Sequence, residues 1–280
     1  MRTVIVTGAS GSMGSAAVRE LSGGGSRVIM ACRNIAKAES VRARVLEEFP
    51  GACIEIMELD LGSLASVRRF AASVQGSGLV LFNNAGVINR DHRLTEDGYE
   101  RTYQVNFLAP ALLTLLLSDR LARVVSMVSL TCSLVSIPQG YTGDSATSDG
   151  GSGASGSSGV SAASYSQLGS YARAKLAMLL FTLELGRRTP LDVAVADPGV
   201  VNSNMISMGR WFDPLADVIF RPLCSSPEKG VAPALRAIQS TETEPLYYVG
   251  RRARTMPGRF TSSSADSIAR SLYELIITAI

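Results

Sequence analysis

The sequence contains few of the residues that bind metal ions through nitrogen or sulfur. Among its 280 residues there is one histidine, His92, and there are four cysteines, at positions 32, 53, 132 and 224. These cysteines lie far apart and form no C-x-x-C pair, so the spacing that a zinc site needs is absent. We therefore predict no metal site, and thiols that stay reduced and unpaired, as in a cytoplasmic protein.

Excess charge of one sign and long apolar runs are also scarce. The formal net charge of +3 is too small to indicate a nucleic-acid partner, and we interpret the basic run RRAR at 251–254 as solvated surface. Apolar stretches such as APALLTLL at 109–116 are far too short to cross a bilayer. No basic and apolar leader precedes the first predicted strand, so we expect no signal peptide, no integral membrane span and a cytoplasmic location.

What the sequence does contain is an alternation of short β-branched runs and longer helical patterns. Helical spacing of apolar residues occurs at 35–49 and 63–74, where Ser63 is placed to accept a hydrogen bond from a free N–H of the first turn. Strands joined through helices pair in parallel, and nearly continuous apolar strands indicate a sheet covered on both faces. We predict one α/β domain over 1–280, with a doubly wound, Rossmann-like parallel sheet and a C-terminal helix at 268–280. The predicted strands are 3–7, 27–31, 52–57, 79–83, 123–129 and 191–196.

The segment 140–164 does not fit this alternation. Fifteen of its 25 residues are glycine or serine, and Val160 is its one aliphatic residue larger than alanine. Such a stretch buries too little apolar surface to offset the entropy lost on ordering. We predict a disordered surface insertion, and a functional lid is the alternative.

A glycine-rich turn, TGASGSMG at 7–14, follows the first predicted strand and precedes a helical pattern. Glycines let the backbone approach a phosphate, and a helix N-terminus supplies N–H donors. The G-x-G-x-x-G spacing is absent, so the stretch alone fits a plain turn as well as a dinucleotide loop. Arg33 follows the second strand, where folds that prefer NAD commonly place an acid. An arginine there suits a 2′-phosphate, and an ordinary surface arginine is the alternative.

Further motifs follow in order along the chain: LDL (59–61), NNAG (83–86), QVNFL (104–108), YARAK (171–175) and DPGVVNS (197–203). Between Thr3 and about Ser203 the sequence resembles the short-chain dehydrogenases/reductases, most closely the NADPH-using branch that includes retinol dehydrogenases and protochlorophyllide reductase. The resemblance implies NADP(H) as cofactor, with no metal. It places the pyrophosphate on the glycine loop, the 2′-phosphate at Arg33, the adenine and its ribose beside the LDL and NNAG motifs, and the nicotinamide past the sixth strand. The implied cofactor residues are Gly8, Ser10, Gly11, Ser12, Met13, Gly14, Arg33, Asp60, Leu61, Asn84, Ala85, Gly86, Tyr171, Lys175, Pro198, Gly199, Val201 and Ser203.

The resemblance also implies a catalytic group. Tyr171 would exchange a proton with the substrate oxygen, and Lys175, four residues on and on the same helix face, would lower the pKa of that phenol and hold the nicotinamide ribose. Ser129 at a strand end would orient the oxygen, although it precedes Tyr171 by 42 residues, a gap that the insertion explains. Ser126 and Ser133 remain alternatives. Asn106 would hold a helix and a water that passes protons to Lys175, or would only stabilise the helix.

The segment 202–223 is rich in large apolar side chains, among them Met205, Met208, Trp211 and Phe212. In the family this segment covers the substrate, so we expect an apolar, fairly bulky small molecule. Core packing, a dimer contact and contact with a membrane surface would use the same residues. The tail at 268–280 is expected to pack on the domain or on a partner subunit, which leaves a homo-oligomer open.

Three departures from the family pattern concern the proposed site. Ser12 stands at a usual glycine, Ala109 replaces a glycine after Asn106, and the insertion lies beside the active site. We expect Ser12 to be tolerated, with its hydroxyl capping the helix or touching phosphate and Gly11 absorbing the turn. The leading hypothesis is an NADP(H)-dependent oxidoreductase acting on a carbonyl or alcohol. Alternatives are a catalytically silent dinucleotide sensor or scaffold and, more weakly, a light-driven C=C reductase.

Overall fold

The computed structural model describes residues 1–141, 165–201, 225–241, 246–250 and 252–279. The predicted substrate-covering segment 202–223 lies outside these residues. Of the predicted insertion, Gly140 and Tyr141 are described, and Tyr141 is buried with its ring edge-on to Tyr103 at 5.4 Å between centroids.

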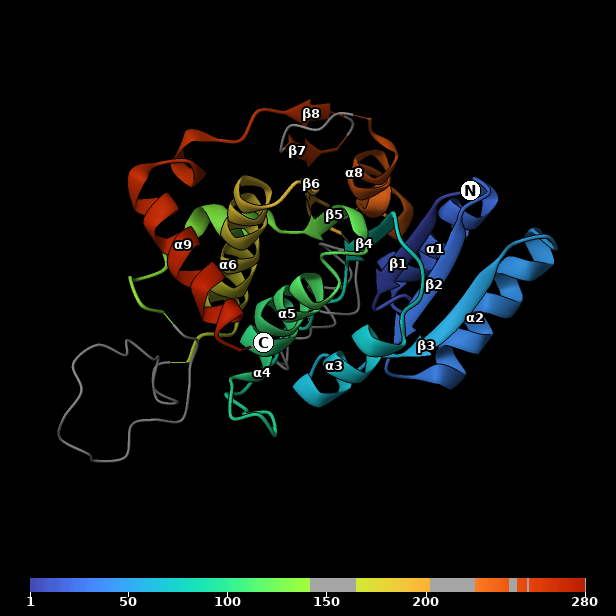
Figure 1. The fold of residues 1–280 in the computed structure, drawn as a ribbon, viewed down its shortest axis with the longest axis horizontal. Helices are drawn as coiled ribbons and strands as arrows, with labels where there is room; N and C mark the ends of the chain where they lie inside the picture. Colours follow the sequence, from blue (N-terminus) through green and yellow to red (C-terminus); the bar gives the residue numbers. More distant parts are fainter. Residues whose placement is uncertain (142–164, 202–224, 242–245, 251, 280) are drawn as a thin grey trace, which may run out of the picture.

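An eight-stranded sheet forms the centre of the described chain, in the order β3-β2-β1-β4-β5-β6-β7-β8 (Figure 1). All neighbouring strands are parallel except β7 and β8, which pair antiparallel. The strands are β1 (Thr3–Thr7), β2 (Arg27–Cys32), β3 (Ile54–Glu58), β4 (Leu79–Asn83), β5 (Leu121–Met127), β6 (Asp192–Asp197), β7 (Leu246–Val249) and β8 (Arg252–Arg254). The helices are α1 (Ser12–Gly23), α2 (Ile35–Glu48), α3 (Leu64–Ser73), α4 (Arg101–Tyr103), α5 (Ala109–Leu116), α6 (Gln167–Arg188), α8 (Pro227–Gln239) and α9 (Ser263–Ile277). The predicted doubly wound parallel sheet is confirmed.

Helices cover both faces of the sheet and bury one apolar cluster on each. Side chains of α3, α5, α6 and α9, such as Phe70 and Phe181, pack on one face. Side chains of α1, α2 and α8, such as Val18 and Val41, pack on the other. Ser63 accepts a hydrogen bond from the backbone N–H of Ser66 and begins α3, as expected from the sequence. This two-sided burial explains why the strands read as continuous apolar runs.

The C-terminal helix α9 begins at Ser263, five residues before the predicted start, because Ser262 accepts a hydrogen bond from Ala265 N–H and caps it. Its first turn is polar and carries no apolar spacing, so the pattern analysis did not detect it. The helix lies beside α6 and α5 of its own chain, with Leu272 and Ile276 buried (Figure 1). Packing on the domain is one of the two arrangements expected for this tail, and a homo-oligomer stays an alternative.

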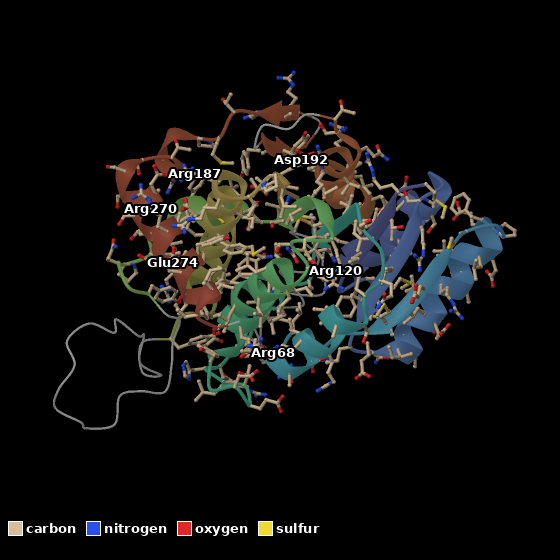
Figure 2. The ribbon with its side chains drawn as sticks, viewed as in Figure 1. Arg68, Arg120, Arg187, Asp192, Arg270 and Glu274 are labelled. Carbon is tan, nitrogen blue, oxygen red and sulfur yellow. The ribbon has the colours of Figure 1, made fainter. Side chains whose placement is uncertain are left out.

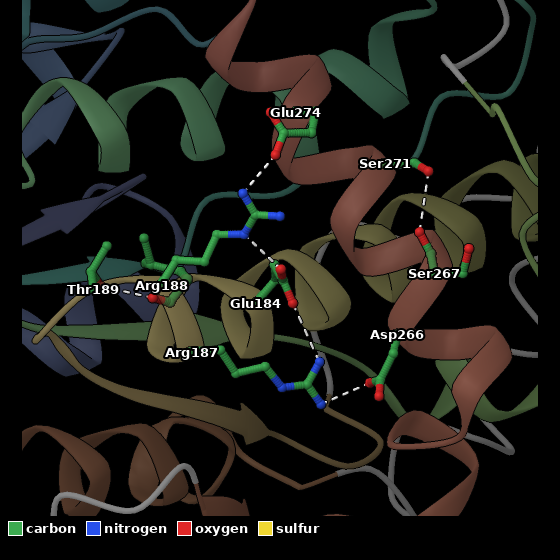
Figure 3. Close-up of polar contacts among 9 residues, drawn as sticks. Glu184, Arg187, Arg188, Thr189, Asp266, Ser267, Ser271 and Glu274 are labelled. Carbon is green, nitrogen blue, oxygen red and sulfur yellow. Dashed lines mark hydrogen bonds and ion pairs between the residues drawn. The ribbon is translucent and has the colours of Figure 1, made fainter.

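Charged side chains line one edge of the contact between α6 and α9. Figure 2 places Arg187 and Glu274 in this region, and Figure 3 enlarges the contacts. The buried carboxylate of Glu184 accepts from Arg188 Nε at 2.7 Å and from an Arg187 nitrogen at 3.3 Å. The same two arginines reach Asp266 and Glu274 on α9, at 2.7 and 2.5 Å. These contacts orient α9, while its buried apolar side chains provide most of the stabilisation.

Candidate active site

A cavity of about 490 Å³ opens at the carboxyl ends of the strands. It lies where the strand order of the sheet reverses, between β1 and β4. Twelve of the predicted cofactor residues line it: Gly8, Ser10, Gly11, Ser12, Met13, Gly14, Arg33, Asp60, Leu61, Asn84, Ala85 and Gly86. Four further residues that were not predicted from sequence also line the cavity: Lys37, Val87, Arg101 and Val105. Lys37 lies one turn beyond Arg33, and that proximity was the available signal.

The glycine loop has two positions where a side chain does not fit. Gly8 adopts the left-handed φ of 63°, and a Cβ there would lie 3.0 Å from the Ala85 Cα. A Cβ on Gly14 would lie 2.3 Å from the Gly8 carbonyl oxygen. The loop therefore keeps a bare backbone cradle at the N-terminus of α1, the geometry that suits a pyrophosphate.

Ser12 begins α1 and is exposed, but it does not cap the helix. The N-cap is Gly11, which has an ordinary φ of −76° and makes no side-chain hydrogen bond. The expectations that Ser12 caps α1 and that Gly11 absorbs a difficult turn are therefore wrong, because the left-handed position is Gly8. Ser12 has no left-handed φ, so its backbone conformation does not require glycine. Its tolerance in cofactor binding and a contact of its hydroxyl with phosphate stay predictions.

The end of β4 is tied to the end of β1. Thr7 Oγ1 accepts from the backbone N–H groups of Asn84 and Ala85, both at 3.0 Å, and Asn84 Nδ2 donates to Thr7 O at 2.8 Å. Asn84 is buried and lines the cavity, yet its Oδ1 has no hydrogen-bond partner among the described residues. An unpaired buried acceptor is costly, so this atom suits a donor such as a ribose hydroxyl. The glycine cradle and Asn84 together fit a dinucleotide.

Basic groups gather where the cavity meets the end of β2. Arg33 is 61% exposed, and its guanidinium lies 3.9 Å from Asp60 Oδ1. The Asp60 carboxylate also accepts from Gly62 N–H at 2.8 Å. Helix α2 begins beside Arg33, with Asn34 accepting from Lys37 N–H at 2.8 Å. Two cationic side chains and a helix N-terminus therefore surround this end of the cavity.

The structure brings Ser129, Tyr171 and Lys175 together at the ends of β5 and α6. The Ser129 side chain lies close enough to the Tyr171 phenol to lower its pKa, and Thr131 Oγ1 donates a hydrogen bond to Ser129 Oγ at 3.0 Å. Lys175 is buried, donates from Nζ to Met127 O at 2.8 Å, and lies 6.0 Å from the centroid of the Tyr171 ring.

Burial raises the pKa of Tyr171 to about 12, and the nearby Ser129 side chain opposes this shift. Burial also lowers the pKa of Lys175 to about 8. Lys175 is not among the groups that shift the pKa of Tyr171, so the expected lowering by Lys175 is not observed. The physical reason is that loss of hydration disfavours the charged form of each group.

The alternative serines lie in other positions. Ser126 is fully buried and accepts from Thr182 Oγ1 at 2.9 Å, farther along α6 than Lys175. Ser133 is half-buried in the short 3₁₀-helix Leu130–Leu134 that follows Ser129. Ser129 is the serine that affects the pKa of Tyr171.

Asn106 lies in a π-helical turn, Gln104–Leu108, that leads directly into α5. Its Oδ1 accepts from Val87 N–H at 2.8 Å, and its Nδ2 donates to Val87 O at 2.7 Å. The side chain therefore holds the segment after NNAG, and a role in proton transfer stays a prediction. Ala109 follows in ordinary helical conformation, so its φ does not require glycine.

The turn after β6 contains Gly199, with a left-handed φ of 68°. Val201 pairs with Ser225 in an isolated parallel bridge. Ser203, Met205, Met208, Trp211 and Phe212 lie outside the described residues. Asp197, which was not predicted as a site residue, is buried at the end of β6 beside this turn. None of the described helices could span a membrane, and within the described ranges no histidine, cysteine and carboxylate side chains cluster as metal ligands.

The geometry can be compared with known proteins. A family model described as short chain dehydrogenase matches residues 2–142. A WW domain-containing oxidoreductase of Danio rerio is 33% identical over 98% of this chain and 67% of its own length. Retinol dehydrogenase 14 of Homo sapiens is 32% identical over 98% of this chain and 84% of its own length. A crystal structure of an uncharacterized protein from Mycobacterium Paratuberculosis superposes with a TM-score of 0.75 at 30% identity, covering 99% of this chain and 92% of that one.

Proposed function

The chain belongs to the short-chain dehydrogenase family of oxidoreductases, and from that premise we propose that it transfers hydride between NADP(H) and a carbonyl or alcohol carbon, with Tyr171 as the acid–base group. The observation that supports this most directly is the position of Tyr171 at the carboxyl edge of the sheet, with Lys175 Nζ 6.0 Å from the centroid of its ring and Ser129 close enough to lower its pKa. Parallel sheets of this kind place their chemistry at that edge.

The chain's own residues would manage the proton. The nicotinamide, when bound, supplies or accepts the hydride. In the reducing direction Ser129 donates a hydrogen bond to the carbonyl oxygen, and the Tyr171 hydroxyl transfers its proton to that oxygen as the alcohol forms. A pKa of about 12 keeps Tyr171 protonated at neutral pH, which suits a proton donor. Lys175 would hold the nicotinamide ribose with the N–H groups that Met127 does not use.

Replacing Tyr171 by phenylalanine tests the catalytic assignment. We expect Tyr171→Phe to abolish turnover and to leave NADPH affinity within about twofold, because the variant loses only the hydroxyl. Tyr165→Phe is the matched control, since the Tyr165 hydroxyl donates to Asn89 O at 3.0 Å. Measurements would follow NADPH absorbance with a panel of aldehydes, ketones and apolar alcohols. Retained turnover in Tyr171→Phe would remove this residue from the mechanism. NADPH binding without turnover of any substrate by the unmodified chain would favour the sensor alternative.

The preference for NADP(H) over NAD(H) rests on the basic end of the cavity. Arg33 and Lys37 line it, and no acid follows β2 directly. A charge-assisted hydrogen bond contributes about 1.5–3 kcal/mol, so we expect Arg33→Ala to weaken NADPH binding about tenfold or more and to leave NADH binding unchanged. Arg44→Ala, an exposed change on α2, is the control. Equal effects on the two cofactors would contradict the assignment.

An apolar substrate is supported by the surroundings of the catalytic pair. Leu130 and Leu134 follow Ser129 and are 59% and 79% exposed, and Leu168, one turn before Tyr171, is 49% exposed. Exposed leucines close in sequence to Ser129 and Tyr171 favour an apolar substrate. Relatives named retinol dehydrogenase and polyprenol dehydrogenase are in keeping with a fairly bulky apolar alcohol or its carbonyl counterpart.

A further inference from the structure

Asp197 carries a buried carboxylate whose role the proposed mechanism does not explain. The residue ends β6 and is 1% exposed. Its Oδ1 accepts from the Gly199 backbone N–H at 2.8 Å, and its Oδ2 accepts from the Tyr247 hydroxyl at 2.7 Å. Burying a carboxylate is costly even with two neutral donors, so an arrangement of this kind needs a reason other than stability.

The sheet register explains how Tyr247 reaches this carboxylate. Strands β6 and β7 are parallel, with Val195 level with Tyr247 and Asp197 level with Val249. Alternate residues of a strand share one face, so Asp197 lies on the same face as Val195, two residues nearer the carboxyl edge. The Tyr247 side chain spans this diagonal and ties β7 to the end of β6.

The other oxygen of Asp197 fixes the turn that follows. A side-chain oxygen that accepts from the backbone two residues on closes a local turn, and here the residue that donates is Gly199. Gly199 has a left-handed φ, so the contact holds a conformation that few other residues would adopt. The two hydrogen bonds that Asp197 accepts, from Tyr247 and from Gly199, therefore determine where the Pro198–Gly199 turn lies.

This turn adjoins the catalytic residues through the next strand. Val128 N–H donates to Ala196 O at 2.9 Å, and Lys175 Nζ is held by Met127 O. Ala196 and Met127 are level in the sheet, so Asp197 is one residue beyond the level at which Lys175 is bound. The Pro198–Gly199 turn therefore has a fixed position relative to Lys175 only while the end of β6 holds it in place.

We propose that Asp197 and Tyr247 are positioning residues that hold the Pro198–Gly199 turn in the place that receives the nicotinamide end of the cofactor. This inference rests on the proposed function and on the family resemblance, which places the nicotinamide end of the cofactor past β6. Neither residue needs to touch the cofactor, because both act through the backbone of the turn.

Direct binding measurements in a Tyr171→Phe background test the positioning role without turnover. The ligands are NADPH and adenosine 2′,5′-bisphosphate, which has the adenosine half and no nicotinamide. We expect Tyr247→Phe and Asp197→Ala to weaken NADPH binding about tenfold, since each removes a hydrogen bond to a charged group or the group itself. Adenosine 2′,5′-bisphosphate should bind within about twofold of the parent. Asp197→Asn should bind NADPH about as tightly as the parent, because its amide can still accept from Gly199 and donate to Tyr247.

The outcomes are distinguishable. Unchanged NADPH affinity in both Tyr247→Phe and Asp197→Ala overturns the positioning role alone, and so does an equal loss for both ligands, which would indicate general distortion. Failure of the parent to bind either ligand overturns the proposed function together with this inference.

Discussion

We expect the replacement of Lys175 by methionine to stabilise the protein while removing a residue of the proposed site. Lys175 is 3% exposed, and the described contact of its ammonium is the hydrogen bond to Met127 O. Burial lowers its pKa from 10.5 to about 8, because a charge inside the protein loses hydration that one carbonyl does not replace. Methionine fills a similar volume without a charge.

The magnitude follows from the shift. A change from 10.5 to about 8 corresponds to about 3 kcal/mol that the folded state loses while the ammonium is charged. The variant leaves Met127 O without its hydrogen-bond donor, which costs about 1 kcal/mol of stability. Lys175→Met should therefore be about 2 kcal/mol more stable than the parent at pH 7. Between pH 8 and 10.5 the unfolded chain binds the proton that the folded chain has released, so the stability of the parent rises through this range. The advantage of the variant should therefore disappear by about pH 10.

Chemical denaturation at pH 7 and pH 10 measures both quantities. The exposed Lys229, changed to methionine, is the control for loss of a surface charge. Comparing each variant with the parent at the same pH cancels the titration of other groups. The reasoning is refuted if Lys175→Met is less stable than the parent at pH 7, or if its advantage is the same at pH 10.

Two further predictions concern the glycine loop and the C-terminal helix. Gly14→Ala places a Cβ 2.3 Å from the Gly8 oxygen. It should therefore cost about 1–3 kcal/mol of stability and weaken NADPH binding at least about tenfold. Gly11→Ala, whose Cβ would lie 3.2 Å from the same oxygen, should have a mild effect in both assays. Similar results for the two variants would contradict the cradle. Leu272→Ala, in the contact between α9 and α6, should cost about 2–5 kcal/mol in denaturant unfolding, and the exposed Glu274→Gln should cost much less. Equal losses would mean that the charged contacts of Figure 3 dominate the docking of α9.

The six strands predicted from sequence are those with a local signal, and the structure confirms them. Their apolar runs are continuous because helices cover both faces of the sheet. Strands β7 and β8 were not predicted; they are four and three residues long and depend on neighbouring strands for their pairing. The RRAR run is exposed where it is described, as expected, but three of its residues also form β8. Strands as short as these carry too little periodicity to identify without the rest of the sheet.

The residues of the candidate site also divide into those with a local sequence signal and those without one. Tyr171 and Lys175 were predictable because their spacing puts them on one helix face, and Gly8 and Gly14 because they belong to a local turn. Asp197 and Tyr247 are 50 residues apart, and their contact follows from the register of two strands, one of which had no sequence signal. The predicted lowering of the Tyr171 pKa by Lys175 was wrong for a similar reason. The spacing shows that Lys175 is near, but it does not show how deeply both groups are buried.

The separation of the two buried charges is itself informative. Lys175 is held by the carbonyl of Met127, and Asp197 by the hydroxyl of Tyr247 and the N–H of Gly199, so each is compensated by neutral groups. Asp197 is not among the groups that shift the pKa of Lys175. A direct ion pair between them would raise the pKa of Lys175, and the ammonium would then be bound to the carboxylate rather than available to a ribose. Keeping the charges apart leaves the Lys175 pKa at about 8, where the amine can both bind a ligand and exchange a proton near neutral pH.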